Sequence, residues 1–66
     1  MTITLNQQPI DVAEDITLGS LLDIQGIART GIAVAVNNKV VRKTDWENFH
    51  LGAGDNVLVI TAVRGG

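Results

Sequence analysis

The sequence has no cysteine and a single histidine, His50, among its 66 residues. Without a thiol, the chain cannot form a disulfide, supply a cysteine nucleophile or hold an iron–sulfur cluster. One histidine with no cysteine to join it also predicts that the chain binds no metal. Because a chain this short buries only about 60% of the surface that its unfolded form exposes, we expect one domain with a thin core.

Positive charge and long apolar runs are also scarce. The net charge is −2, and the basic residues are scattered along the chain at Arg29, Lys39, Arg42, Lys43 and Arg64. A phosphate backbone requires a basic cluster, so we expect no nucleic-acid partner. No apolar run approaches the length that crosses a bilayer, and "MTITLNQQ" lacks the charged leader and apolar core of a signal peptide. These absences predict a cytoplasmic domain, monomeric when alone, that has no membrane partner.

The first pattern that is present is an alternation of apolar and polar residues near the N-terminus. Residues 2–6, "TITLN", place Ile3 and Leu5 on one face and predict a strand. The two glutamines followed by Pro9 indicate a turn, and alternation resumes at Ile10 and Val12. These two runs predict a β-hairpin.

The period then changes to that of a helix. Leu18, Leu21 and Leu22 stand at i, i+3 and i+4, the spacing of one helical face. Thr17 is the expected N-cap, and Gly26 the expected stop, because glycine readily takes the left-handed conformation that closes a helix. A glycine inside this stretch, at position 19, weakens a helix, so we expect a short one held mainly by packing.

The second half of the chain predicts another hairpin and a final strand. Two β-rich runs flank Asn37 and Asn38, and asparagine tolerates the positive φ of a two-residue turn. Residues 44–49 predict an irregular or single-turn helical connection with Thr44 as a possible cap. "GAGD" predicts a turn, and residues 56–63 the last strand. Trp46 and Phe49 are expected to close the edge of the core.

The element order is therefore β-β-α-β-β, a short helix, and β. It favours an α+β domain in which one main helix packs on one face of a mixed sheet of about four to five strands. The long crossover between the first and last strands allows them to be parallel neighbours at the centre. This is the β-grasp arrangement. We assign residues 1–63 to the domain and residues 64–66 to a flexible tail.

The last strand is apolar on both faces. Residues 57–60 read "VLVI", although one short helix can cover only one face of the sheet. We assign Val57 and Val59 to the core. If the alternating residues faced the other way, the core set and the outer set would simply exchange places. The residues predicted to form an apolar patch on the other face, for docking a partner, are Leu58, Ile60, Ala62, Ala33 and Ala35. The alternative is that Leu58 and Ile60 are scattered surface residues or lie under the stems of Lys39 and Lys43.

The sequence finishes on Arg64, Gly65 and Gly66. Three residues extend about 10 Å, and glycines pass through a slot too narrow for other residues. This suits a terminal carboxylate that reacts inside the active site of another protein, for example after adenylation by ATP. The chain has no phosphate-binding glycine loop and no convincing nucleophile–base pair. We therefore expect it to be a substrate of enzymes and not an enzyme.

Several stretches together resemble one family. They are the helix start "TLGSLL", the hairpin "AVNNKVV" followed by Trp46, the strand entry "GDNVLVI" and the tail "AVRGG". In order, spacing and total length they are similar to the ubiquitin-like sulfur carriers, most of all to the ThiS family of thiamine biosynthesis. The resemblance covers essentially the whole chain.

The resemblance implies a mechanism. An adenylating enzyme of the ubiquitin-activating type would use ATP and magnesium to activate the Gly66 carboxylate, so the chain itself binds no cofactor. Sulfur from a persulfide on a partner protein would convert Gly66 to a thiocarboxylate, and thiazole synthase would take that sulfur. Gly65 would give access, Arg64 would pair with an acidic residue at the partner's entry channel, and the outer-face residues would dock both partners.

Three alternatives stay open from the sequence. The small subunit of molybdopterin synthase shares the fold, the glycine pair and the thiocarboxylate chemistry, but is typically longer. Protein modifiers of the ubiquitin type end in the same way and form isopeptide bonds. A plain β-grasp interaction module would bind through its outer face, and its tail would have no chemical role.

Overall fold

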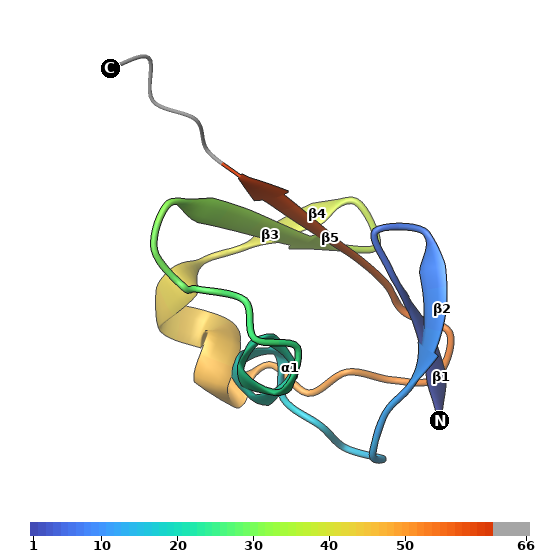
Figure 1. Ribbon diagram of the computed structural model, residues 1–66. Helices are drawn as coiled ribbons and strands as arrows, with labels where there is room; N and C mark the ends of the chain where they lie inside the picture. Colours follow the sequence, from blue (N-terminus) through green and yellow to red (C-terminus); the bar gives the residue numbers. More distant parts are fainter. Residues whose placement is uncertain (62–66) are drawn as a thin grey trace.

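The computed structural model describes residues 1–61, which form one sheet with a helix packed on one face (Figure 1). The elements follow the predicted order: β1 Thr2–Leu5, β2 Gln8–Asp11, α1 Leu18–Ile24, β3 Ile32–Val36, β4 Lys39–Val41, the 3₁₀ helix η1 Lys43–Asn48 and β5 Asn56–Thr61. The last two residues of the predicted final strand lie outside the described range. No helix in residues 1–61 is long and apolar enough to cross a membrane.

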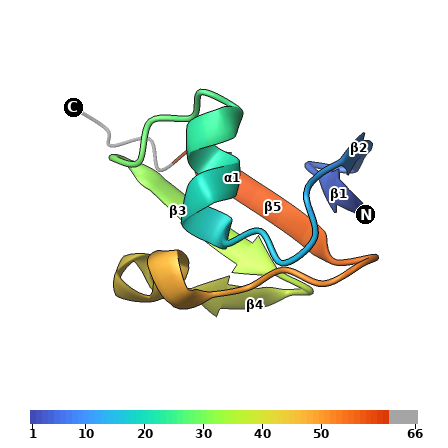
Figure 2. The same ribbon diagram turned by 90° about the horizontal axis from the view of Figure 1, so that it is seen from below.

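The five strands are arranged in the order β2-β1-β5-β3-β4. β1 and β5 are parallel neighbours, whereas the pairs β1–β2, β3–β4 and β3–β5 are antiparallel. The crossover between β1 and β5 contains the helix, which lies across the sheet when the molecule is viewed from below (Figure 2). The predicted mixed sheet with one main helix is confirmed, including the central parallel pair.

The helix begins and ends where its capping residues predict. The Thr17 side chain accepts a hydrogen bond from the Ser20 amide at 3.1 Å, and Gly26 follows the C-cap with φ +70°. At the other end the Gly26 amide donates to the Asp23 carbonyl at 3.1 Å, so each end of this seven-residue helix has a partner for a backbone group that would otherwise be unpaired. Leu18, Leu21 and Leu22 are completely buried against the sheet.

Two asparagine-containing turns make the hairpins. Asn37 and Asn38 have φ of 52° and 71°, as the two-residue turn between β3 and β4 requires. In the first hairpin the predicted turn at the glutamines and Pro9 is displaced: the positive-φ residues are Asn6 and Gln7, at 50° and 71°. Pro9 lies within β2, opposite Thr4. The prediction was wrong there because a proline is tolerated in an edge strand, where its missing N–H faces away from the sheet.

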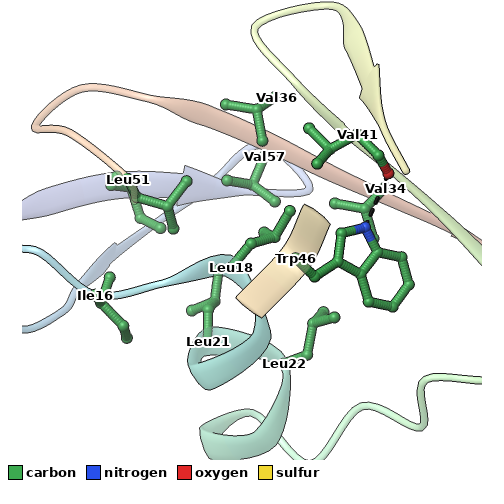
Figure 3. Packing of buried hydrophobic residues seen from close by; sticks show 11 residues of the cluster. Ile16, Leu18, Leu21, Leu22, Val34, Val36, Val41, Trp46, Leu51 and Val57 are labelled. Carbon is green, nitrogen blue, oxygen red and sulfur yellow. Dashed lines mark hydrogen bonds between the residues drawn. The ribbon is translucent and has the colours of Figure 1, made fainter. Parts of the chain in front are cut away.

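Trp46 closes the core from the side of η1 (Figure 3). It is 1% exposed, and its indole Nε1 donates a hydrogen bond to the Val41 carbonyl at 2.8 Å, which satisfies its polar atom. Phe49 is partly buried against the same core, so both aromatic predictions are confirmed. The predicted Thr44 cap is wrong: η1 starts at Lys43, and its N-cap residue makes no side-chain cap bond.

Arg29 connects α1 with η1. Its guanidinium bonds the Asp23 carboxylate, with Nη2 to Oδ2 at 3.1 Å, bonds the Glu47 carboxylate, and donates to the Gly19 carbonyl at 3.0 Å. The hydrogen bond to Glu47, followed by that to Asp23, raises the pKa of Arg29. A Cβ on Gly19 would come within 2.9 Å of Arg29 Nη2 and would overlap the Glu47 carboxylate. A side chain at position 19 would therefore require the ends of the Arg29 and Glu47 side chains to shift, a local contact that helix propensity does not reveal.

We predict that Leu21→Ala lowers the free energy of unfolding by about 2–5 kcal/mol, because it removes a fully buried side chain and leaves a cavity. The matched control is Ile24→Ala in the same helix, where the side chain is 70% exposed and the loss should stay within about 0.5 kcal/mol. Urea unfolding followed by Trp46 fluorescence measures both. Equal losses in the two variants would show that the helix does not bury the face described here.

Candidate functional site

An apolar patch lies on the face of the sheet opposite α1. Residues directly paired in antiparallel strands project to the same face. Ile60 pairs with Ala33, Leu58 pairs with Ala35, and Ala35 pairs with Val40. The alternating residues of these strands, Val57, Val34 and Val36, are buried under the helix. The outer-face patch is therefore formed by Ala33, Ala35, Val40, Leu58 and Ile60.

The patch is accessible and has a clear border. Val40 is 74% exposed and Ile60 56% exposed, so the lysine stems considered as a cover leave both side chains open. Toward β1 and β2 the same face becomes polar: Thr4 donates to Asn56 at 2.9 Å, and Thr2 donates to Asp11 at 2.7 Å. The apolar surface is thus confined to the half of the sheet formed by β3, β4 and β5.

Val40 is a member of the patch that sequence reasoning missed. The signal was available, because a two-residue turn at Asn37 and Asn38 pairs Val36 with Lys39 and hence Ala35 with Val40. The other predicted patch member, Ala62, lies outside the described residues, as do Arg64, Gly65 and Gly66. The structure therefore brings together four of the predicted docking residues, Leu58, Ile60, Ala33 and Ala35, and adds Val40.

Asn6 marks the point where β5 leaves its parallel neighbour. Its backbone amide donates to the Val57 carbonyl at 2.8 Å, and its side-chain Oδ1 accepts from the Val59 amide at 2.8 Å. The side chain thus takes the place of the next carbonyl of a longer β1, while the backbone at φ 50° turns toward β2. Asparagine suits both tasks, since it tolerates positive φ and offers a short acceptor.

The remaining polar residues organise loops. His50 Nδ1 lies 3.0 Å from Asp15 Oδ1, and the imidazole stays exposed. Within residues 1–61 no three His, Asp or Glu side chains gather as a metal site. Asp55 accepts from the Gly52 amide at 2.7 Å and from the Asn37 side chain at 3.1 Å, which confirms its predicted place in the turn before β5.

Comparison with known proteins identifies the family. The model of the ThiS family matches residues 2–66. The chain belongs to the ThiS family. It is 29% identical over 66 residues to the sulfur carrier protein ThiS of Escherichia coli strain K12, and the match covers 100% of both chains. The resemblance to this family that the sequence motifs indicated is confirmed.

Solved structures agree with this membership. The crystal structure of the thiamine biosynthesis protein ThiS from Geobacter metallireducens matches with a TM-score of 0.88 and 26% identity, covering 100% of both chains. The solution NMR structure of a thiamine biosynthesis protein from the same organism matches with a TM-score of 0.75 and 26% identity, covering 100% of this chain and 87% of that one. The β-grasp sheet described above is therefore the fold of the ThiS family.

We predict that Asn6→Ala lowers the free energy of unfolding by about 1–3 kcal/mol, because it removes the acceptor of the Val59 amide and because alanine tolerates the positive φ at this position less well than asparagine. Asn6→Asp is the matched control, since aspartate keeps an acceptor oxygen and tolerates the same backbone conformation. Hydrogen exchange of the Val59 amide, combined with urea unfolding, measures the effect. Unchanged protection of Val59 in Asn6→Ala would contradict the assigned hydrogen bond.

Proposed function

We propose that this chain is a sulfur carrier of thiamine biosynthesis whose sulfur is held on the main-chain carboxyl group of Gly66. The carrying observation is that the ThiS family match reaches residue 66 and that the Escherichia coli sulfur carrier protein ThiS aligns over its whole length. The resemblance to the family implies a thiocarboxylate at Gly66, and a chain with no cysteine agrees with it, because that sulfur needs no thiol side chain.

The chemistry proceeds in three steps at the Gly66 carboxyl group. In the first, a carboxylate oxygen attacks the α-phosphate of ATP in an adenylating enzyme of the ubiquitin-activating type, and pyrophosphate leaves. The outer sulfur of a persulfide on a partner protein then attacks the carbonyl carbon and displaces AMP, which gives an acyl disulfide. In the third, a thiol attacks the partner's own sulfur, so that a disulfide forms there and the Gly66 thiocarboxylate is released. The net result is one oxygen of the carboxylate exchanged for sulfur. Thiazole synthase accepts that sulfur from the thiocarboxylate.

The chain's own contribution is presentation and not catalysis. We assign residues 1–63 to a folded body and residues 64–66 to the tether that enters the partner's active site. Gly65 and Gly66 have no side chains to obstruct a narrow channel. Arg64 would pair with an acidic residue at the channel entrance. ATP and magnesium belong to the activating partner, and we place these reactions in the cytoplasm.

The outer-face patch is the proposed docking surface for the adenylating enzyme and thiazole synthase. It is apolar, its Val40 and Ile60 side chains are exposed, and one side of it is formed by β5, the strand that leads directly into the tail. A partner that covers Ile60 and Leu58 would also hold the tether close to its own active site. Ala33, Ala35 and Val40 present a flat floor to such a partner, and Ala62 is expected to extend it.

We predict that the protein gains the mass of one oxygen-to-sulfur exchange when it is incubated with the adenylating enzyme, ATP, magnesium, a persulfide donor and a thiol that reduces the acyl disulfide. Intact mass spectrometry measures the change. Deletion of Gly66, or one additional residue after it, should abolish the gain, while the fold remains intact by circular dichroism. The loaded protein should then support product formation by thiazole synthase. Loading that persists without Gly66, or sulfur transfer only to molybdopterin synthase, would contradict the proposal.

We predict that Ile60→Glu weakens binding of the adenylating enzyme about tenfold or more, because it places a charge in the centre of an apolar contact. Ile24→Glu is the matched control: Ile24 is also a largely exposed isoleucine, but it lies on α1 at the other side of the sheet. Isothermal titration calorimetry compares the two variants. Equal weakening by both would show that the outer face is not the docking surface.

A further inference from the structure

The backbone of β5 is hydrogen-bonded to a different extent on its two edges, toward β3 and toward β1. Its even-numbered residues hydrogen-bond toward β3, as shown by the Asn37 amide donating to the Asn56 carbonyl at 2.8 Å. The backbone amides and carbonyls of its odd-numbered residues face β1: the Val57 carbonyl accepts from the Asn6 amide, and the Val59 amide donates to Asn6 Oδ1. The edge toward β1 is therefore paired only as far as Asn6 reaches.

Beyond Asn6 this edge is open. The Val59 carbonyl and the Thr61 amide point to the side of β1, and within residues 1–61 neither group has a hydrogen-bond partner on that side. β1 ends at Leu5, and the chain turns away into β2 while β5 continues beside β3 (Figure 1). Thr61 is exposed. A donor and an acceptor two residues apart on one strand edge fit one extended peptide strand.

The outer edge of the sheet at β2, unlike the open edge of β5, is protected against pairing with another strand. Pro9 lies in that edge strand and offers no N–H to an incoming chain. The open stretch of β5 has no such protection, although natural sheets usually blunt exposed edges. It also adjoins Ile60 of the outer-face patch and directly precedes the tail in the sequence. It is therefore continuous with the patch and the tail, the two parts of the chain assigned to the adenylating partner.

We propose that the open edge of β5, from the Val59 carbonyl to the Thr61 amide, is a strand-addition site for a short extended segment of the adenylating enzyme. The inference rests on the proposed function and names a contact within it. Main-chain hydrogen bonds at this edge fix register and not sequence. They would hold β5 in its extended direction as far as the tail and set the distance between the docked body and Gly66.

The first test is hydrogen exchange at single amides. In the free protein the Thr61 amide should exchange rapidly, whereas the Ile60 amide, which faces β3, should be protected. In the saturated complex with the adenylating enzyme, the Thr61 amide should be protected at least about tenfold more than in the free protein. Rapid exchange of Thr61 in that complex overturns the inference, and so does failure of the complex to form.

A variant pair tests the same contact without exchange data. Thr61→Pro removes an N–H that the described sheet does not use and fixes φ at about −65°, while it leaves Ile60 in the extended conformation that it already has. Thr61→Val keeps the N–H. The proline variant should bind the adenylating enzyme about two- to tenfold more weakly than the valine variant, the effect of one backbone hydrogen bond. Trp46 fluorescence should show an intact core in both. Equal binding of the two folded variants overturns the inference.

Two further outcomes are distinguishable. Normal sulfur loading of the unmodified chain together with an unprotected Thr61 leaves the carrier function standing and overturns the strand-addition site. Protection of Thr61 in the free protein that grows with protein concentration assigns the edge to a second copy of this chain and also overturns it. Protection that appears only with the enzyme supports the inference even if no sulfur is transferred, because binding is measured separately from loading.

Discussion

The parallel pairing of β1 with β5 is the interaction on which the rest of the structure depends. The Thr4 amide donates to the Asp55 carbonyl at 2.9 Å and the Asn6 amide to the Val57 carbonyl at 2.8 Å, so the first and last strands of residues 1–61 meet at the centre of the sheet. This contact places α1 inside the crossover, where it covers one face. It also directs β5 past the end of β1, so that the strand carries its C-terminal half to the border of the molecule.

Because of this arrangement, one face of the sheet is buried under the helix and the other is left uncovered. One face buries Val57, Val34 and Val36 under three leucines of α1, and Trp46 closes it from the side. The other face keeps an apolar half over β3, β4 and β5 and a polar half over β1 and β2. The surface proposed for docking is the uncovered side of the same strand, β5, whose buried side stabilises the fold.

Much of this could be predicted because the decisive signals are local. Leu18, Leu21 and Leu22 specify the helix face, Asn37 and Asn38 the turn, and the apolar run in β5 reveals a face without cover. The errors concern places where tertiary contacts decide: Pro9 is tolerated in a strand only because that strand is an edge, and the 3₁₀ helix begins at Lys43 without the predicted Thr44 cap. The role of Asn6 depends on which residue of β5 lies beside it in the sheet. That register cannot be predicted from the local sequence around Asn6.

The central position of β5 also has a consequence for synthesis on the ribosome. Of the five strands, β5 is the last to be translated. It lies between β1 and β3, which belong to two separate hairpins made earlier. A nascent chain still missing residues 56–61 lacks the middle of its sheet, and hairpins alone are at best marginally stable. The domain should therefore fold only once residues 56–61 have been made, and shorter products should lack the part of the outer-face patch that β5 contributes.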